Sequence, residues 1–223
     1  DGRLLCTGSE DKRARIFDVA TGEEVKRFEH DDIVVAVGFS ADGRLLCTGS
    51  RDERARIFEV ATGKVLKRFN HDAGMVWAAG FSADGRFLCT GSADKTARIF
   101  DVETGKELKC LRHDSEVNAA GFSADGRLLC TGSDDKSARI FDVVTCKALT
   151  CFLHDDLAWA VGFSADGRFL CTGSKDKTAR IFEVATDQEP TILEHDSPVW
   201  AAGFSTDGRF LCTGSKDKTA RIF

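Results

Sequence analysis

Nine cysteines and five histidines are the side chains of this 223-residue chain that could form a metal site. Zinc sites use cysteine and histidine ligands that often occur in closely spaced pairs such as Cys-x-x-Cys. No such pair occurs in this sequence. We therefore expect no metal site and no cofactor.

The residues with reactive side chains recur at regular intervals, because the chain is a repeat. The segment Asp-Gly-Arg-Leu-Leu-Cys-Thr-Gly-Ser at residues 42–50 returns with little change, in copies that start at Asp1, Asp42, Asp84, Asp125, Asp166 and Asp207. A step of 41 or 42 residues indicates one supersecondary unit stacked repeatedly. We predict a single repeat domain over residues 1–223.

Six of the cysteines occupy one equivalent position of the repeat: Cys6, Cys47, Cys89, Cys130, Cys171 and Cys212. We interpret them as small buried side chains in a reducing compartment, which predicts an intracellular location, cytoplasmic or nuclear. Cys110, Cys146 and Cys151 fall elsewhere in the repeat. A partial oxidised set that involves these three stays open.

One repeat, residues 30–69, predicts four short strands in an antiparallel meander. The strands are expected over residues 34–39, 44–49, 54–58 and 65–69. The first two are almost continuously apolar or small, which indicates a sheet covered on both faces. The fourth carries more charge and is expected at an outer edge, where Pro190, in the fourth strand of its copy, would be tolerated.

Two tight turns of the repeat depend on glycine. Gly43 suits the positive φ that a turn after the first strand requires. The turn before the fourth strand has Gly22, Gly63 and Gly105 in three copies, but Cys146 and Asp187 in two others. If positive φ is needed there, the last two turns should be strained.

Composition excludes some classes of function. The net charge is -5 with acids and bases interspersed, so no basic stripe suggests a nucleic-acid partner. No apolar run approaches the ~18 residues of a membrane span, so membrane insertion is not expected. The pattern gives four complete units and three strands at each end. A ring would then need missing residues or another chain to close.

The repeat resembles the WD-repeat β-propeller family over the whole chain. The matching residues are His30, residues 38–43, Cys47-Thr48-Gly49-Ser50, Asp52 and Arg56-Ile57-Phe58-Glu59. The resemblance implies an all-β propeller of four-stranded antiparallel blades: four complete blades and two incomplete terminal ones, as a six-bladed ring or part of a seven-bladed ring. The family's tryptophan at the end of the third strand is phenylalanine in every copy: Phe17, Phe58, Phe100, Phe141, Phe182 and Phe223.

In the family a buried hydrogen-bonded chain links tryptophan, serine or threonine, histidine and aspartate. Carried over by position, the sets are His30, Thr48 and Asp52; His71, Thr90 and Asp94; His113, Thr131 and Asp135; His154, Thr172 and Asp176; His195, Thr213 and Asp217. Phenylalanine lacks the indole N–H, so each set loses that donor. A Thr-His-Asp set also resembles a nucleophilic triad. Five identical active sites in one chain, without an oxyanion-hole motif, favour a structural role, and we expect no catalytic residues.

Two positions of the repeat vary. The second residue of the first strand is Val35, Trp77, Asn118, Trp159 or Trp200, and the residue before the turn aspartate is Glu10, Arg51, Ala93, Asp134, Lys175 or Lys216. The resemblance places the first set near the rim of a central channel, a surface often used for binding, and the second set on the same rim. Tryptophan offers a large contact area, and the two lysines favour an acidic peptide. The alternative is that the tryptophans pack beneath a loop and the charges are ordinary solvated turn residues.

These observations favour a non-catalytic scaffold that binds a protein or peptide on the rim, alone or as a subunit of a larger complex. A structural ring without a dedicated ligand, amplified or designed, is the first alternative, because the copies are nearly identical. A propeller enzyme that uses the channel is the weaker one, because every histidine is assigned to a structural set.

Overall fold

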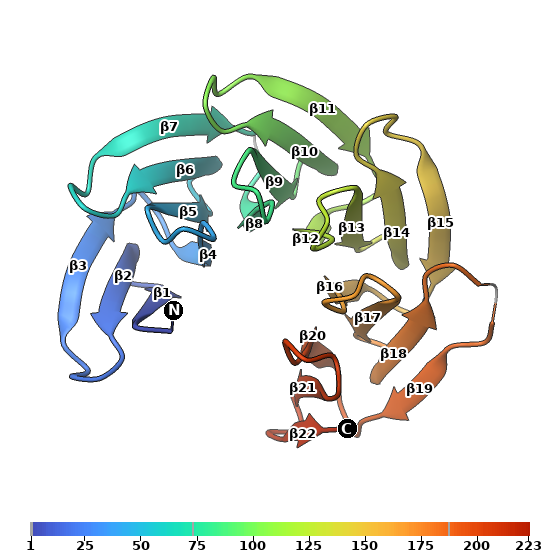
Figure 1. Ribbon diagram of the computed structural model, residues 1–223. Helices are drawn as coiled ribbons and strands as arrows, with labels where there is room; N and C mark the ends of the chain where they lie inside the picture. Colours follow the sequence, from blue (N-terminus) through green and yellow to red (C-terminus); the bar gives the residue numbers. More distant parts are fainter. Residues whose placement is uncertain (1, 73, 187) are drawn as a thin grey trace. The chain divides into compact units, whose positions relative to one another are not determined.

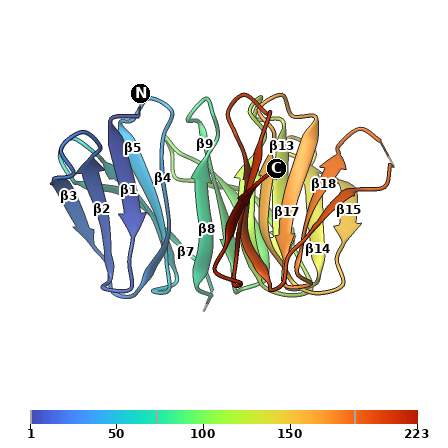
Figure 2. The ribbon, with the colours of Figure 1, turned by 90° about the horizontal axis from the view of Figure 1, so that it is seen from below.

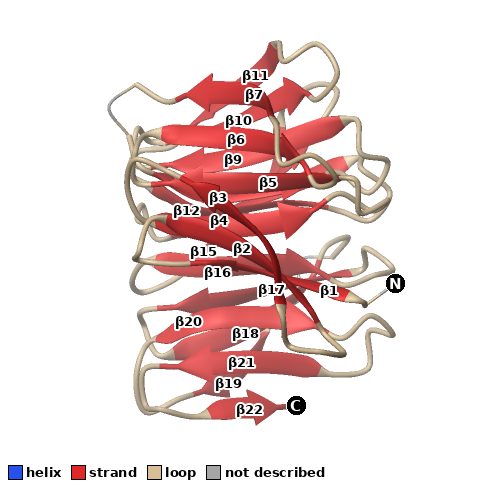
Figure 3. Cartoon of the chain, turned by 90° about the vertical axis from the view of Figure 1, so that its left-hand side faces the viewer, coloured by secondary structure: helices blue, strands red, loops and turns tan. Residues whose placement is uncertain are grey.

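A computed structural model describes residues 2–72, 74–186 and 188–223, and every regular element in them is a strand (Figure 3). The described residues form 22 strands in six antiparallel sheets, of which four have four strands and two have three. The three-stranded sheets come first and last in the sequence. The predicted all-β architecture is therefore confirmed, strand number included.

The chain divides into two compact units, residues 1–110 and 111–223. The first holds three sheets: β1 (Leu4–Gly8), β2 (Arg13–Asp18) and β3 (Glu24–Glu29); β4 (Val34–Phe39), β5 (Leu45–Ser50), β6 (Arg54–Glu59) and β7 (Val65–Asn70); β8 (Val76–Phe81), β9 (Phe87–Ser92), β10 (Thr96–Asp101) and β11 (Glu107–Arg112), in which the boundary falls. In each sheet the strands lie side by side in sequence order (Figure 1).

The second unit also holds three sheets: β12 (Val117–Phe122), β13 (Leu128–Ser133), β14 (Ser137–Asp142) and β15 (Ala148–Leu153); β16 (Ala158–Phe163), β17 (Phe169–Ser174), β18 (Thr178–Glu183) and β19 (Thr191–Glu194); β20 (Val199–Phe204), β21 (Leu211–Ser215) and β22 (Ala220–Ile222). The strands of each sheet run between two sets of turns (Figure 2). The expectation of one domain over residues 1–223 stays a prediction.

Burial differs between the four strands of a sheet. In the sheet β4–β7, the second strand β5 is buried from Leu46 to Ser50, and the third strand β6 is buried from Ala55 to Phe58. The fourth strand β7 is a sheet edge and alternates between covered and exposed residues. The first strand β4 is mostly half-buried. It is the other edge strand, and sheet edges are less covered than the central strands.

Sheets of the same unit pack face to face. In the first unit, Cys47 and Ile57 of the sheet β4–β7 lie in one core cluster with Leu88 of the next sheet. In the second unit, Ile140 and Leu170 share a cluster in the same way. These contacts bury most of the apolar side chains that the repeat supplies, so each internal sheet is stabilised by the hydrophobic effect on both faces.

The cysteines at the repeated position differ in exposure. Cys47, Cys89, Cys130 and Cys171 are fully buried, and burial raises the pKa of the Cys89 and Cys171 thiols to about 12. Because a thiolate does not form at neutral pH, the Cys89 and Cys171 side chains act as small apolar groups. The prediction of burial was wrong for Cys6, which is half-buried, and for Cys212, which is exposed. Within the described second unit, no neighbouring sheet covers that face of β21.

Backbone conformation agrees with the sequence-based expectation at Gly43 and differs from it after the turn aspartates and at Pro190. Gly43 has the predicted positive φ of 69°. The residue after each turn aspartate also has positive φ, between 67° and 71°, although it is never glycine: Lys12, Glu53, Lys95, Lys136, Lys177 and Lys218. Pro190 lies just before β19 and not within a strand, since β19 begins at Thr191. A residue without an N–H cannot donate to a strand ladder.

Cys146 holds the glycine position of its turn at a φ of 58°, where Gly22, Gly63 and Gly105 have φ of 73°, 78° and 76°. The expected strain is therefore present in the conformation of Cys146. Asp187, the other replacement, lies outside the described residues. A non-glycine residue in this region is destabilised by ~1–2 kcal/mol. Glycine avoids this strain, but it loses more conformational entropy on folding, which offsets part of the gain.

We expect Cys146→Gly to raise the free energy of unfolding by about 1 kcal/mol, because it removes this strain. Urea denaturation measures the change. Gly22→Cys is the matched control: a Cβ at Gly22 meets no atom within 4 Å, so the variant adds strain without a clash. It should lower stability by a similar amount. Equal midpoints for Cys146→Gly and the parent chain would contradict the interpretation.

Candidate functional site

Each histidine lies in the loop that precedes the first strand of a sheet, and it points its Nε2 atom at a threonine of the second strand. The Nε2–Oγ1 distances are 2.9 Å for His30 and Thr48, 2.9 Å for His71 and Thr90, 3.1 Å for His113 and Thr131, and 3.0 Å for His195 and Thr213. The predicted His154–Thr172 bond is missing, because both atoms are buried without a hydrogen-bond partner among the described residues.

The aspartates bind the other side of the imidazole ring in three sets. Nδ1 lies 2.8 Å from Oδ2 of aspartate in the His71–Asp94 pair, 3.3 Å in His113–Asp135 and 3.1 Å in His154–Asp176. Because Nδ1–H donates to a carboxylate, the opposite nitrogen is free to accept the threonine hydroxyl. In the His195–Asp217 pair the distance is 3.6 Å, which is too long for a hydrogen bond.

The predicted set of His30 and Asp52 does not form as expected. His30 Nδ1 lies 3.2 Å from the backbone oxygen of Phe28, and Asp52 accepts bonds from the Asp31 amide and Arg56. The residue two positions after the aspartate explains the difference. In the His71 set, the hydroxyl and amide of Thr96 hold Asp94 Oδ1 at 2.6 Å and 3.0 Å, which turns Oδ2 toward the imidazole. That position is Arg54 in the His30 set, and it has no hydroxyl.

An arginine on the third strand completes each set, and the sequence reasoning missed it. Arg98 Nη2 lies 2.7 Å from Asp94 Oδ2. The equivalent pairs are Asp11–Arg15, Asp52–Arg56 (2.7 Å), Asp135–Arg139 (2.7 Å), Asp176–Arg180 (2.9 Å) and Asp217–Arg221 (3.5 Å). The signal was present, because Asp-x-x-x-Arg recurs in all six copies.

The charges of these sets suit a structural role. Burial lowers the pKa of His30, His71, His113 and His154, so their rings are neutral near pH 7. Burial opposes ionisation of Asp94, but hydrogen bonds from Thr96 and His71 outweigh it and lower the pKa of the carboxyl. Thr48, Thr90, Thr131 and Thr172 are fully buried. A hydroxyl that solvent cannot reach cannot attack a substrate, so the sets do not form nucleophilic sites.

The first variable position is the site of a β-bulge. The strand register shifts across the variable residue of each first strand, between Val34 and Ala36, Val76 and Ala78, Val117 and Ala119, Ala158 and Ala160, and Val199 and Ala201. Val35, Trp77, Asn118, Trp159 and Trp200 are therefore the unpaired extra residues. A bulge re-aims its side chain and leaves the ladder on either side intact.

The second variable position is fixed beside the first by a backbone bond. The amides of Arg51, Ala93, Asp134, Lys175 and Lys216 donate to the carbonyl oxygens of Ile33, Met75, Glu116, Leu157 and Pro198, each two residues before a bulge residue. Both variable sets are thus at the same end of their sheets. We call this the bulge end. The expectation that these residues bind a partner stays a prediction.

The bulge-end residues of the first unit contact one another. The Arg51 guanidinium lies over the Trp77 ring, 5.4 Å from its centroid, which is a cation–π distance. Val35 is 37% exposed. Trp77 therefore contacts Arg51, which is itself half-buried.

The bulge-end residues of the second unit are more open. Asn118 Nδ2 donates to Asp134 Oδ1 at 2.6 Å. Trp159 is half-buried, and Trp200 is 56% exposed. Lys175 and Lys216 are both exposed, and Lys175 lies 3.8 Å from Asp156. Aromatic and cationic groups are thus accessible together in this unit.

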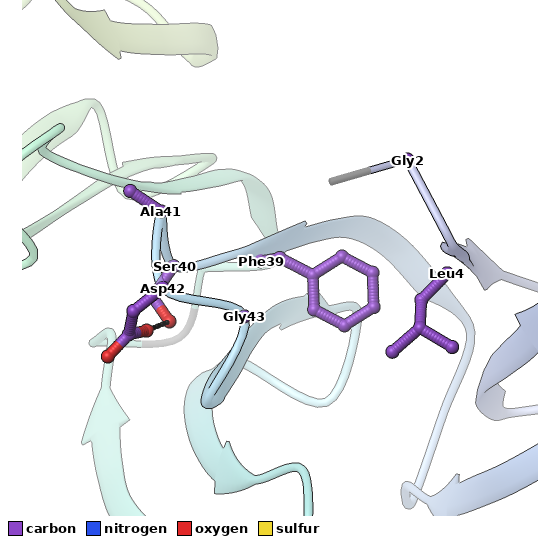
Figure 4. Close-up of a pocket in the computed structure, with 7 residues that line it drawn as sticks. All are labelled: Gly2, Leu4, Phe39, Ser40, Ala41, Asp42 and Gly43. Atoms are coloured by element: carbon purple, nitrogen blue, oxygen red, sulfur yellow. Dashed lines mark hydrogen bonds between the residues drawn. The ribbon is translucent and has the colours of Figure 1, made fainter.

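Three further features concern metal ligands, membrane-spanning helices and a crevice beside the turn at Asp42. Among the described residues, no group of three or more His, Cys, Asp or Glu side chains is arranged to hold a metal ion. In residues 2–72, 74–186 and 188–223, no helix is long and apolar enough to cross a membrane. A crevice in the first unit lies between Leu4, Phe39 and the turn at Asp42 (Figure 4). Asp42 Oδ1 accepts a 2.6 Å bond from the Ser40 hydroxyl and a 3.0 Å bond from the Arg44 amide, so this oxygen is already engaged within its own turn.

The repeat matches a known family description six times. The description "WD domain, G-beta repeat" matches residues 1–18, 22–59, 63–101, 105–142, 146–183 and 187–223. The chain belongs to the WD-repeat family. Its sheets are the antiparallel blades of a WD-repeat β-propeller, and such domains are in general non-catalytic scaffolds for protein interaction. None of the curated proteins matches the chain.

We expect Asp94→Ala in this WD-repeat chain to lower the free energy of unfolding by about 3 kcal/mol, because it leaves the buried His71 ring and the half-buried Arg98 guanidinium without their carboxylate partner. Urea denaturation followed by circular dichroism measures the loss. Asp72→Ala is the control: Asp72 is 95% exposed although it also contacts Arg98. It should cost less than about 0.5 kcal/mol. Similar midpoints for the two variants would contradict the assignment.

Stability should fall as the pH drops below about 6.5, the usual pKa of histidine. Burial lowers the folded-state pKa of His71 and three other histidines, so only the unfolded chain gains protons in that range. Their contribution is fully present above that pH and is lost toward the lower folded pKa. Urea midpoints at about pH 7.5 and 5.5 measure it. His71→Asn should flatten the dependence, whereas an unchanged slope would disprove it.

Proposed function

We propose that this WD-repeat protein is a scaffold that binds an acidic protein or peptide segment at the bulge end of its second unit. The contact surface is defined by Trp159, Trp200, Lys175 and Lys216. The observation that carries the proposal is that two tryptophans stand at bulges and two exposed lysines lie at the same end of their sheets. We also propose an intracellular location in a reducing compartment, which fits the free thiols at the repeated position.

The tryptophans would supply the affinity. Trp200 is 56% exposed, which is unusual for so large an apolar side chain, and Trp159 is half-buried. An aromatic side chain of this kind buries a large area on binding and loses little conformational entropy. Trp77 is not included, because it already contacts Arg51.

The lysines would supply the preference for negative charge. The Lys216 amide is bonded to the Pro198 carbonyl, and the Lys175 amide is bonded to the Leu157 carbonyl, each two residues before a tryptophan. The backbone of each lysine is therefore close to the bulge that carries a tryptophan. Complementary charge at the margin of a contact increases the association rate and the specificity.

A library of random peptides displayed on phage tests the proposal. Selected peptides should be rich in Asp and Glu, and their affinity should fall at least about tenfold for the Trp159→Ala, Trp200→Ala double variant. Lys175→Gln with Lys216→Gln should weaken binding more at low salt than at high salt.

Trp77→Ala is the matched control, since it removes the tryptophan that is occupied by Arg51, and it should leave peptide affinity unchanged. Thermal melts of all variants show whether they fold. Peptides that bind the double tryptophan variant as well as the parent chain would refute the proposal. A library that yields no binding peptide would favour the architectural alternative, a ring without a dedicated ligand.

A further inference from the structure

Two arginines face each other across the strands β6 and β7 in the first unit. Arg56 and Arg68 are direct register partners, and Arg54 precedes them on the same face of β6. Like charges opposite one another destabilise an antiparallel pair unless something neutralises them. The side chain of Arg56 is only 6% exposed, so solvent screens it poorly.

The first sheet carries the same three arginines, and there acidic residues neutralise them. Arg15 and Arg27 are register partners on β2 and β3. Glu24 bridges the pair, with contacts of 3.2 Å to Arg15 Nε and 2.6 Å to Arg27 Nε. Arg13, the counterpart of Arg54, is paired with Glu29 at 2.9 Å.

The sheet β4–β7 keeps the arginines but lacks both acids. By register, Val65 stands where the first sheet has Glu24, and Asn70 stands where it has Glu29. The third sheet of the unit has Glu107 at the first of these positions, and it lies 3.3 Å from Arg98. Asp52 binds Arg56 Nη1 at 2.7 Å, but the sheet β4–β7 differs from the other two sheets of its unit in having no carboxylate at this register position that could bridge Arg56 and Arg68.

The missing carboxylate leaves guanidinium donors unused. Among the described residues, Arg56 Nη1 and Nη2 are bonded to Asp52 and Asp31 but Nε has no acceptor, and the exposed Arg68 has neither a hydrogen bond nor an ion pair. In other sheets the equivalent Nε binds a hydroxyl, as in the 3.0 Å bonds from Arg98 to Thr96 and from Arg139 to Ser137. Arg54 occupies that hydroxyl's position in the sheet β4–β7.

The unused donors open into a cleft of about 500 Å³ whose walls include Arg54, Arg56, Arg68 and Val65. Two acids also line it. Glu29 is already paired with Arg13, and Asp31, 74% exposed, contacts Arg54 at 2.8 Å and Arg56 at 3.5 Å. An ion pair so open to solvent contributes little and leaves the deeper donors accessible.

We propose that this cleft, the Arg56–Arg68 cleft, binds an oxyanion on a side chain of a partner protein segment, held where Glu24 lies in the first sheet. The occupant is a glutamate carboxylate or the phosphoryl group of a phosphorylated residue, because a guanidinium fork binds both in the same bidentate manner. The chain itself shows the chemistry that fills the equivalent space. The site is separate from the bulge-end surface of the second unit and does not depend on it.

Fluorescence anisotropy with three labelled peptides tests the proposal: a glutamate-rich peptide, the same peptide with phosphoserine replacing one glutamate, and an all-glutamine version. Parent protein should bind at least one of the acidic peptides and not the glutamine version. Val65→Glu recreates the bridge of the first sheet, and Arg68→Gln removes the exposed donors without touching the core. Each should weaken binding about tenfold or more.

Arg27→Gln is the matched control, because Glu24 already occupies its guanidinium, and it should leave binding unchanged. Preference for the phosphoserine peptide identifies a phosphoryl source, and equal binding identifies a carboxylate. Repeating the titrations in the Trp159→Ala, Trp200→Ala background removes the contribution of the bulge-end surface, and the loss of affinity caused by Arg68→Gln should persist there. Parent protein that binds neither acidic peptide below about 1 mM, or unchanged affinity in Arg68→Gln, would overturn the proposal.

Discussion

The carboxylate that ends the turn between the second and third strands is the group on which each sheet depends. In the best-formed case, Asp94 binds His71 from the preceding loop, Arg98 from the third strand and Thr96 from its own turn. One side chain thus joins the loop before the sheet to the turn and to the third strand that follows it. A buried ion pair is weak evidence of net stability, but its geometry allows only one arrangement of its partners. It therefore specifies how the loop, the turn and the strand meet.

A substitution next to that carboxylate changes both the internal hydrogen bonds of a sheet and the polar groups that the sheet exposes. Arg54 replaces the hydroxyl found at Thr96, and the neighbouring Asp52 then turns from His30 to Arg56. The same replacement leaves Arg56 Nε without the acceptor that Arg98 has. A single variable position thus affects both the internal hydrogen bonds of the sheet and the charge that the sheet presents in its outer cleft.

Much of the fold follows from the sequence because the signals repeat. Turns such as the one at Gly43 mark every strand boundary, and the hydrophobic pattern of Leu46 and Ile57 recurs at fixed spacing, so 22 strands could be placed in advance. The finer geometry did not follow. The bulge at Trp77 and the positive φ of Lys95 depend on ladder hydrogen bonds that residue types do not encode.

The candidate sites were predictable only in part for the same reason. The histidine and threonine of each set could be placed by position, but the orientation of Asp52 depends on a residue two places away. The Arg56–Arg68 cleft was missed, because its signal is a register difference between Glu24 and Val65 and becomes visible only when strands are paired.

The bulges have a consequence for how such a protein can change over generations. The pairing register skips one residue in the first strand of five sheets: Val35, Trp77, Asn118, Trp159 and Trp200. Replacing one of these residues therefore leaves the neighbouring ladder bonds in place. Mutation can therefore explore new side chains there at little risk to folding. Each duplication of the repeat supplies one more such permissive position, so the chain could acquire new recognition properties one sheet at a time.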